Sequence, residues 1–175
     1  MAKKADTALL IIDMLNDFVL EGAPLEVPDT RKIIKNIQRE LKKAREQGMP
    51  VIYLCDSHRK SDPELKFYPP HAMKGSRGAR VIGELNPEPG EEVIEKHTFS
   101  GFFNTVLDNT LRKLRVKNLL VTGCVTNICV AATVADAFYR GYRCRVKKNC
   151  VAGLDNKGHR YALDQMASVF GAEVS

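Results

Sequence analysis

Apolar residues occur along the chain in two patterns, short continuous runs and stretches with helical spacing. The runs TALLII and VIYLC, at residues 7–12 and 51–55, are free of charge and have the length of strands that are buried on both faces. Between them, apolar residues recur every three or four positions from about residue 29 to 47, which predicts an amphipathic helix. Gly48 and Pro50 then end the helical pattern.

The same alternation continues through the rest of the chain. We expect further strands at 92–95, 118–123 and 142–147, a short one at 172–174, and helices near 106–114, 128–140 and 157–170. Alternating strands and helices favour a mostly parallel sheet with helices on both faces and right-handed crossovers. The sequence therefore predicts a single doubly wound α/β domain over residues 1–175. One long connection, residues 57–91, is where functional residues or a lid are expected.

Composition and charge narrow the class of protein. Of the 175 residues, 44% are hydrophobic and 27% are charged, which is enough apolar material for a stable core. The net charge of +6 comes largely from residues 31–45, where basic and apolar side chains alternate as on the solvated face of a helix. The chain carries no nucleic-acid-binding motif, and no apolar run approaches the ~18 residues of a membrane span. Five cysteines without a Cys-x-x-Cys pair argue against a secreted disulfide scaffold. We expect a cytoplasmic protein that binds neither nucleic acid nor membrane.

Polar or reactive residues follow four of the predicted strands. Asp13 and Asp56 come directly after two strands, Lys96 follows the third, and the turn 123–127 after the fourth leads to Cys129. The carboxyl ends of parallel strands meet at one edge of the sheet, so we expect these side chains to converge. A cysteine in the first turn of a helix is favoured as a thiolate by the helix dipole. With Asp13 to take the thiol proton and Lys96 to stabilise negative charge, the pattern predicts a nucleophilic cysteine.

Three blocks of sequence carry a resemblance to a known family. The chain resembles the isochorismatase-like cysteine hydrolases, which include nicotinamidases and N-carbamoylsarcosine amidases, in ALLIIDMLNDF, EKHTFSGFFNTVLD and VTGCVTNICVAATVADAFYRGYR. The resemblance covers about residues 7–170 and implies a Rossmann-type three-layer α/β fold. It also implies an amidohydrolase of small amides whose catalytic triad is Asp13, Lys96 and Cys129.

The resemblance also implies an oxyanion hole and a substrate pocket. In that family a cis peptide lies in the turn before the nucleophile, which here matches the bond between Cys124 and Val125. The N–H groups of Val125 and Cys129 would then form the oxyanion hole. Phe18 and Tyr68 match pocket aromatics of the nicotinamidase type.

A second group of residues suggests a metal site. Asp56 and His58 are two positions apart at a strand end, so their side chains point to the same side of an extended chain. Nicotinamidases carry Asp-x-His followed by an aromatic-Pro-x-His segment as their metal site, and residues 68–71, YPPH, resemble that segment. The resemblance implies that Asp56, His58 and His71 bind a divalent metal, zinc first and iron or manganese otherwise, completed by water. The metal would bind the pyridine nitrogen of the substrate and turn its amide toward Cys129.

The substrate stays open at this point. Ser57 and Arg59 replace the tryptophan and proline that usually flank the nicotinamidase Asp-x-His. The segment EKHTFSGFF is at least as close to the carbamoylsarcosine branch as to nicotinamidases. Nicotinamide is the first expectation. The alternatives are an N-carbamoyl or ureido amidase, which would bind a carboxylated substrate through Arg59 or another basic group, and a non-catalytic small-molecule or metal-binding module. We also expect a homo-oligomer, and we assign no function to His97 or His159.

Overall fold

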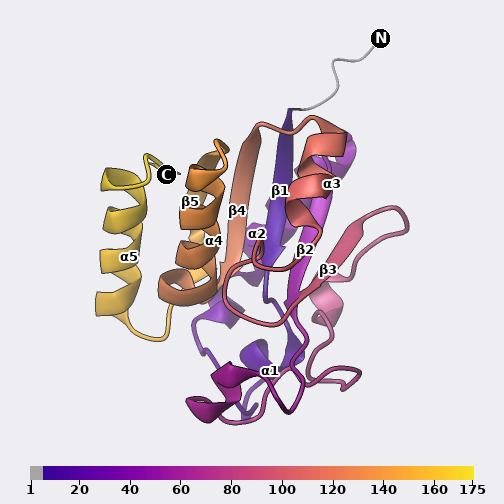
Figure 1. The fold of residues 1–175 in the computed structure, drawn as a ribbon, viewed down its shortest axis with the longest axis vertical. Helices are drawn as coiled ribbons and strands as arrows, with labels where there is room; N and C mark the ends of the chain where they lie inside the picture. Colours follow the sequence, from indigo (N-terminus) through magenta and orange to yellow (C-terminus); the bar gives the residue numbers. More distant parts are fainter. Residues whose placement is uncertain (1–5) are drawn as a thin grey trace.

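The computed structural model describes residues 6–175 and contains a six-stranded sheet in which all paired strands run parallel (Figure 1). The strands are β1 Thr7–Ile12, β2 Val51–Asp56, β3 Glu92–Lys96, β4 Asn118–Cys124, β5 Arg143–Ala152 and β6 Glu173–Val174. Their order is β3-β2-β1-β4-β5-β6, so the chain builds outward from β1 in one direction and then resumes on the other side of β1. The predicted doubly wound α/β fold is confirmed.

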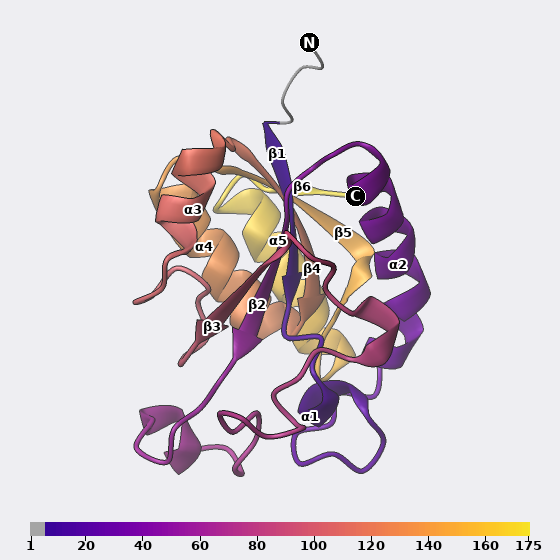
Figure 2. The same cartoon turned by 90° about the vertical axis from the view of Figure 1, so that its right-hand side faces the viewer.

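Helices cover both faces of this sheet. They are α1 Asn16–Val19, α2 Thr30–Glu46, α3 Leu107–Leu114, α4 Ala131–Tyr139 and α5 Asn156–Ser168. Figure 2 shows α2 on one side of the sheet and α3 and α4 on the other. The buried side chains of α5 belong to the same core cluster as those of α3 and α4. Within residues 6–175, no helix combines the length and the apolar character that crossing a membrane requires.

Strand β1 shows why its sequence is a continuous apolar run. Leu9 and Ile11 pack into the core under α2, whereas Ala8, Leu10 and Ile12 pack into the core under α3, α4 and α5. Successive side chains of a strand point to opposite faces, and here both faces are covered by helices. Apolar residues are therefore needed at every position of this central strand.

Two elements differ from the sequence prediction. Strand β5 extends to Ala152 and not to about 147, because buried residues resume at 150–152 after the polar residues 147–149. The pairing of β4 with β5 shifts its register there. The helix expected from about 128 begins earlier, with a π-helical turn at Thr126–Val130 that leads directly into α4.

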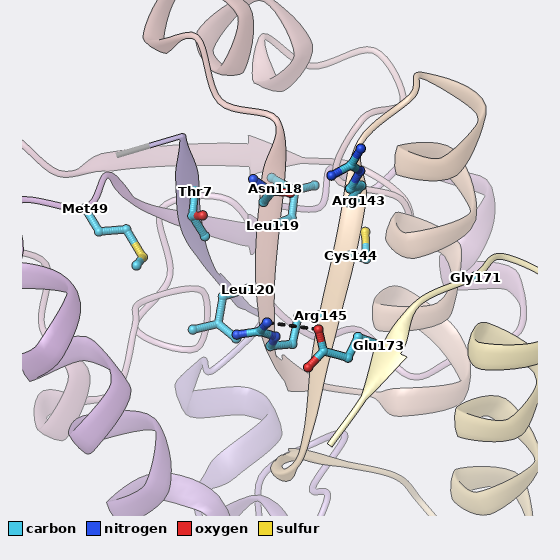
Figure 3. Close-up of a pocket in the computed structure, with 10 residues that line it drawn as sticks. All are labelled: Thr7, Met49, Asn118, Leu119, Leu120, Arg143, Cys144, Arg145, Gly171 and Glu173. Carbon is cyan, nitrogen blue, oxygen red and sulfur yellow. Dashed lines mark ion pairs between the residues drawn. The ribbon is translucent and has the colours of Figure 1, made fainter. Parts of the chain in front are cut away.

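A hollow of about 570 Å³ lies at the amino ends of the strands (Figure 3). Its lining includes Thr7, Asn118 and Arg143, which are the first residues of β1, β4 and β5. Its other charged groups, Arg145 and Glu173, pair with each other at 2.9 Å. The reactive residues expected from the sequence all lie at the opposite end of the sheet, where open parallel sheets bind ligands.

Candidate active site

The candidate site lies where the sheet changes direction, between the carboxyl ends of β1 and β4. Asp13 directly follows β1, and Asp56 and Lys96 are the last residues of β2 and β3. Beyond β4, the chain turns sharply and presents Cys129 in the π-helical turn. Ligand crevices of doubly wound sheets form at this switch point, because the two neighbouring crossovers leave in opposite directions. The fold thus brings together the four side chains that the sequence predicted to converge.

Lys96 is the centre of this group and is fully buried. Its Nζ lies 2.7 Å from Oδ2 of Asp13, 2.5 Å from Oδ1 of Asp56 and 3.6 Å from Sγ of Cys129. One carboxylate oxygen each of Asp13 and Asp56 lies with the Cys129 sulfur in a set of atoms that are all within 4.8 Å of one another. Buried charges require such pairing, because an isolated ammonium in the core would be strongly unfavourable.

The surroundings shift the pKa values of the three candidate catalytic groups. Burial and the neighbouring Asp56 raise the pKa of Asp13 to about 6, against the lowering effect of Lys96. Burial lowers the pKa of Lys96, but Asp13 and Asp56 outweigh it and hold that pKa well above its usual value. Burial raises the pKa of the Cys129 thiol well above its ordinary range, although Lys96 opposes this. The thiol therefore needs a base to lose its proton.

The turn before Cys129 has an unusual backbone. The bond between Cys124 and Val125 is cis, as the resemblance implied. Gly123 has a φ of +112°, and a Cβ at this position would overlap the backbone of Ile12. The carbonyl of Val125 accepts hydrogen bonds from the N–H groups of Ile128 and Val130, at 3.0 and 3.2 Å. The role of the Val125 and Cys129 N–H groups as an oxyanion hole stays a prediction.

Next to this group lies a second, metal-ligating set of side chains. Asp56, His58, Glu64 and His71 are all buried and each offers one ligand atom within 4.8 Å of the others. The sequence predicted three of these residues and missed Glu64. Glu64 lies in a 3₁₀ turn, Pro63–Lys66, within the long connection. The only signal for it was an acidic residue between two predicted ligands.

The orientation of both imidazoles suits metal binding. Nδ1 of His71 donates to the carbonyl of Pro69 at 2.8 Å, and Nδ1 of His58 lies 3.2 Å from Oδ2 of Asp62. Each Nε2 therefore faces the carboxylates, at 3.9 Å from Oε1 of Glu64 in both cases. Metal-binding histidines are commonly held in this way, with the second ring nitrogen bound to a carbonyl or carboxylate.

Buried atoms without hydrogen-bond partners also indicate that this set of residues can bind a metal. Asp56 Oδ2, Glu64 Oε2 and the Nε2 atoms of His58 and His71 are buried and have no hydrogen-bond partner among residues 6–175. Leaving such a group unsatisfied costs about 1–3 kcal/mol each. Burial and the charge of Asp56 raise the pKa of Glu64 to about 7, which reflects the crowding of two carboxylates. Two imidazoles and two carboxylates fit a divalent zinc, iron or manganese ion.

A narrow cavity joins the two groups of residues. Its lining contains Cys129 together with Asp56 and Glu64, and apolar or aromatic side chains form the rest: Phe18, Leu25, Tyr68, Phe99, Val125, Ile128 and Leu154. The predicted pocket residues Phe18 and Tyr68 are thus both in the lining, with ring centroids 5.3 and 6.3 Å from that of His71. Of the described residues that line the cavity, none is Lys or Arg. Arg59, a sequence candidate for binding a carboxylate, is exposed and outside the lining.

The two histidines without an assigned function acquire partners in the structure. Nδ1 of His97 lies 2.7 Å from the carbonyl of Ser57, beside the metal-ligating set. Nδ1 of His159 lies 2.9 Å from Oγ1 of Thr126, in the turn before Cys129. Sequence spacing could not reveal either pair, because the partners are 40 and 33 residues apart.

Comparison with known proteins places the chain in a family. A family model described as "Isochorismatase domain" matches residues 7–175. The chain belongs to the isochorismatase family. The resemblance noted in the sequence is confirmed, and so is the prediction of a hydrolase that acts on C–N bonds, since the family includes nicotinamidases and N-carbamoylsarcosine amidases.

Solved structures of this isochorismatase-family fold differ in their named substrates. The chain is 37% identical to N-carbamoylsarcosine amidase from Thermoplasma acidophilum, with a TM-score of 0.89 over 97% of this chain and 95% of that one. It is 31% identical to nicotinamidase PncA from Bacillus subtilis, with a TM-score of 0.92 over 98% and 99%. It is 27% identical to pyrazinamidase of Pyrococcus horikoshii in complex with zinc, with a TM-score of 0.90 over 98% and 99%.

Proposed function

We propose that this protein hydrolyses the amide of nicotinamide, or of a closely similar heteroaromatic amide, through a thioester on Cys129. The observation that carries the proposal is the single cavity lined by Cys129, by two of the four metal-ligating residues and by aromatic side chains. A planar ring suits the aromatic lining, and Cys129 in the same lining would face an amide on that ring. A substrate with its own carboxylate would instead face Asp56 and Glu64 without a basic side chain in the lining.

The chemistry follows from the positions of the three catalytic groups. Asp13 takes the thiol proton as the Cys129 sulfur attacks the amide carbon, and the Lys96 ammonium stabilises the charges that develop. The N–H groups of Val125 and Cys129 are the proposed donors to the oxyanion. Asp13 then returns its proton to the leaving nitrogen, and ammonia departs as the thioester forms.

The second half of the cycle uses the same groups. Asp13, again ionised, removes a proton from water while the water oxygen attacks the thioester carbon. The C–S bond breaks, and the thiol is restored with the proton held by Asp13. The acid product loses its remaining proton to solvent and leaves as a carboxylate. Because the pKa of Asp13 is about 6, the group can both accept and return a proton near neutral pH.

Asp56, His58, Glu64 and His71 would hold a divalent metal beside this centre. When bound, the metal would supply a Lewis-acidic partner for a ring nitrogen of the substrate. Phe18 and Tyr68 would hold the ring in place through edge contacts in the same cavity.

The runner-up is an N-carbamoyl or ureido amidase. The 37% identity with an N-carbamoylsarcosine amidase favours it. The same triad would serve that reaction, because the attacked group is again an amide carbonyl. The lack of a basic lining residue among those described argues against an anionic substrate.

Ammonia release from nicotinamide, benzamide and N-carbamoylsarcosine, each with and without a chelator, tests the proposal. We expect nicotinamide to be hydrolysed, benzamide to be a poor substrate, and chelation to raise KM for nicotinamide because a binding contact is lost. Activity on N-carbamoylsarcosine that is indifferent to chelator, together with none on nicotinamide in metal-replete enzyme, would favour the runner-up. No release of ammonia from any of the three compounds would contradict the proposal.

A further inference from the structure

The first turn of α5 packs against the turn that carries Cys129. Oγ1 of Thr126 and Nδ1 of His159 are 2.9 Å apart, and Thr126 is fully buried. Thr126 lies between Val125 and Cys129, the two residues whose N–H groups are the proposed oxyanion donors. His159 is therefore one hydrogen bond away from the backbone on which that hole would be built.

Two glycines allow this close approach. A Cβ at Gly153 would lie 2.9 Å from Cβ of His159, and a Cβ at Gly158 would lie 3.1 Å from Nδ2 of Asn127. A side chain at Gly153 would require His159 to shift, and one at Gly158 would crowd the side chain of Asn127 in the turn. Asp155 also fixes the start of the helix, because its side chain accepts a hydrogen bond from the Gly158 N–H at 2.8 Å.

The imidazole of His159 is uncharged near neutral pH, so its hydrogen bond to Thr126 joins two neutral groups. Burial lowers the pKa of His159, although the charge of Asp29 opposes the shift. Either ring tautomer can bind the hydroxyl, since Thr126 can donate or accept. The contact therefore acts through its geometry and adds no charge to the site.

We propose that His159 is a positioning residue, which holds Thr126 and through it keeps the Val125 and Cys129 N–H groups aimed at the developing oxyanion. The proposal rests on the covalent mechanism given above. Oxyanion donors act mainly in the transition state, so their misplacement lowers kcat more than it raises KM. Removing a donor outright costs about 10²–10³ in kcat, and a loosened donor costs less. We expect a loss of about tenfold in kcat when the His159–Thr126 contact is removed.

Three variants test this contact. His159→Phe keeps a ring but removes the nitrogen, Thr126→Val keeps the volume but removes the hydroxyl, and His159→Asn retains a polar atom near the position of Nδ1. We expect the first two to lower kcat with little change in KM, and their combination to be no worse than either alone. His159→Asn should recover most of the loss. Tyr161→Ala, an exposed position on the same helix, is the matched control and should leave kcat unchanged.

The aldehyde that corresponds to nicotinamide gives a readout that a purely structural role would not change. The Cys129 sulfur adds to its carbonyl carbon, the thiol proton moves to Asp13, and the carbonyl oxygen becomes an oxyanion in the hole. Its affinity should fall about tenfold in His159→Phe and Thr126→Val, in parallel with kcat. The affinity of nicotinate, which forms no such adduct, should stay the same.

The outcomes separate this inference from the proposed function. If Cys129→Ala is inactive while His159→Phe and Thr126→Val keep wild-type kcat and aldehyde affinity, the inference is wrong and the proposed function stands. If Cys129→Ala still turns over, the covalent mechanism fails and the inference fails with it. Should His159→Phe not fold, Thr126→Val provides the same comparison, and an unchanged aldehyde affinity in that variant overturns the inference.

Discussion

Lys96 is the residue on which the electrostatics of the site depend. It is fully buried between the carboxylates of Asp13 and Asp56 and near the sulfur of Cys129. Its position could be predicted, because it directly follows the strand predicted at 92–95. It also lies in one of the sequence blocks that resemble a known family. The pairing of one ammonium with two carboxylates could not, since it depends on how three strands line up.

Lys96→Met keeps most of the side-chain volume but leaves two neighbouring buried carboxylates without a countercharge. We expect activity to be lost and the free energy of unfolding to fall by about 3–5 kcal/mol at neutral pH. Urea denaturation of both proteins checks the second value. An unfolding midpoint equal to that of the wild type would contradict the pairing described here.

The pH dependence of the reaction should report Asp13. Its raised pKa, about 6, means that the carboxyl is mostly protonated below pH 6 and cannot accept the thiol proton. We therefore expect kcat/KM to rise with pH up to about 6, to be flat above it, and to fall about tenfold per unit below it. A profile that stays flat down to pH 4.5, with the protein still folded, would be incompatible with Asp13 as the base.

Asp62 should support metal binding through His58. Its Oδ2 lies 3.2 Å from Nδ1 of that imidazole and 2.9 Å from the Arg59 backbone N. We expect Asp62→Asn to weaken zinc affinity by about 10- to 100-fold, measured by competition with a chelating dye. The exposed Asp164→Asn is the control. Equal zinc affinities in the two variants would show that Asp62 does not orient His58.

Glu64 and His159 are two residues near the site whose roles could not be predicted from the sequence. Asp13, Asp56 and Lys96 each mark the end of a predicted strand, so the strand pattern located them. Glu64 lies in an irregular connection with no periodic pattern, and its approach to Asp56 depends on how that connection folds back. His159 meets its partner only because two separate elements pack together.

At the scale of elements, the turn between β4 and α4 is the most constrained segment. Gly123 has a positive φ, and a side chain there would overlap the backbone of Ile12 in the neighbouring strand. We expect Gly123→Ala to lower the free energy of unfolding by about 3 kcal/mol, through both strain and overlap. Gly83→Ala, at a position with open space and without positive φ, should change it by less than about 0.5 kcal/mol. Equal thermal stability of the two variants would contradict this account of the turn.

Most helices and strands could be predicted because the pattern of their apolar residues matches the faces that are buried. The run in β1 is apolar at each position since both faces of the strand are covered. The far end of β5 was missed because three polar residues, 147–149, interrupt its apolar pattern before the buried residues 150–152. The π-helical turn at Thr126–Val130 was missed because a local pattern does not distinguish it from the start of an α-helix.

At the scale of the whole molecule, the site is assembled by topology. The order β3-β2-β1-β4-β5-β6 puts the ends of β1 and β4 side by side and brings Asp13 to Cys129. The alternation of strands and helices predicted a parallel sheet but not this strand order. The connection between β2 and β3 supplies His58, Glu64 and His71. Its first part lies beyond the carboxyl ends of the strands, and the chain then returns to the start of β3 (Figure 2).

The central claim is that Cys129 is the nucleophile of an amidohydrolase, and ammonia release by Cys129→Ala tests it most directly. Cys144→Ala is the matched control, because it removes another buried thiol near the start of β5, at the opposite end of the sheet from Cys129. The account predicts that Cys129→Ala folds with a thermal midpoint close to that of the wild type and releases no ammonia above background, while Cys144→Ala retains most of its activity. Ammonia release by purified Cys129→Ala at a rate near that of the wild type would contradict the account.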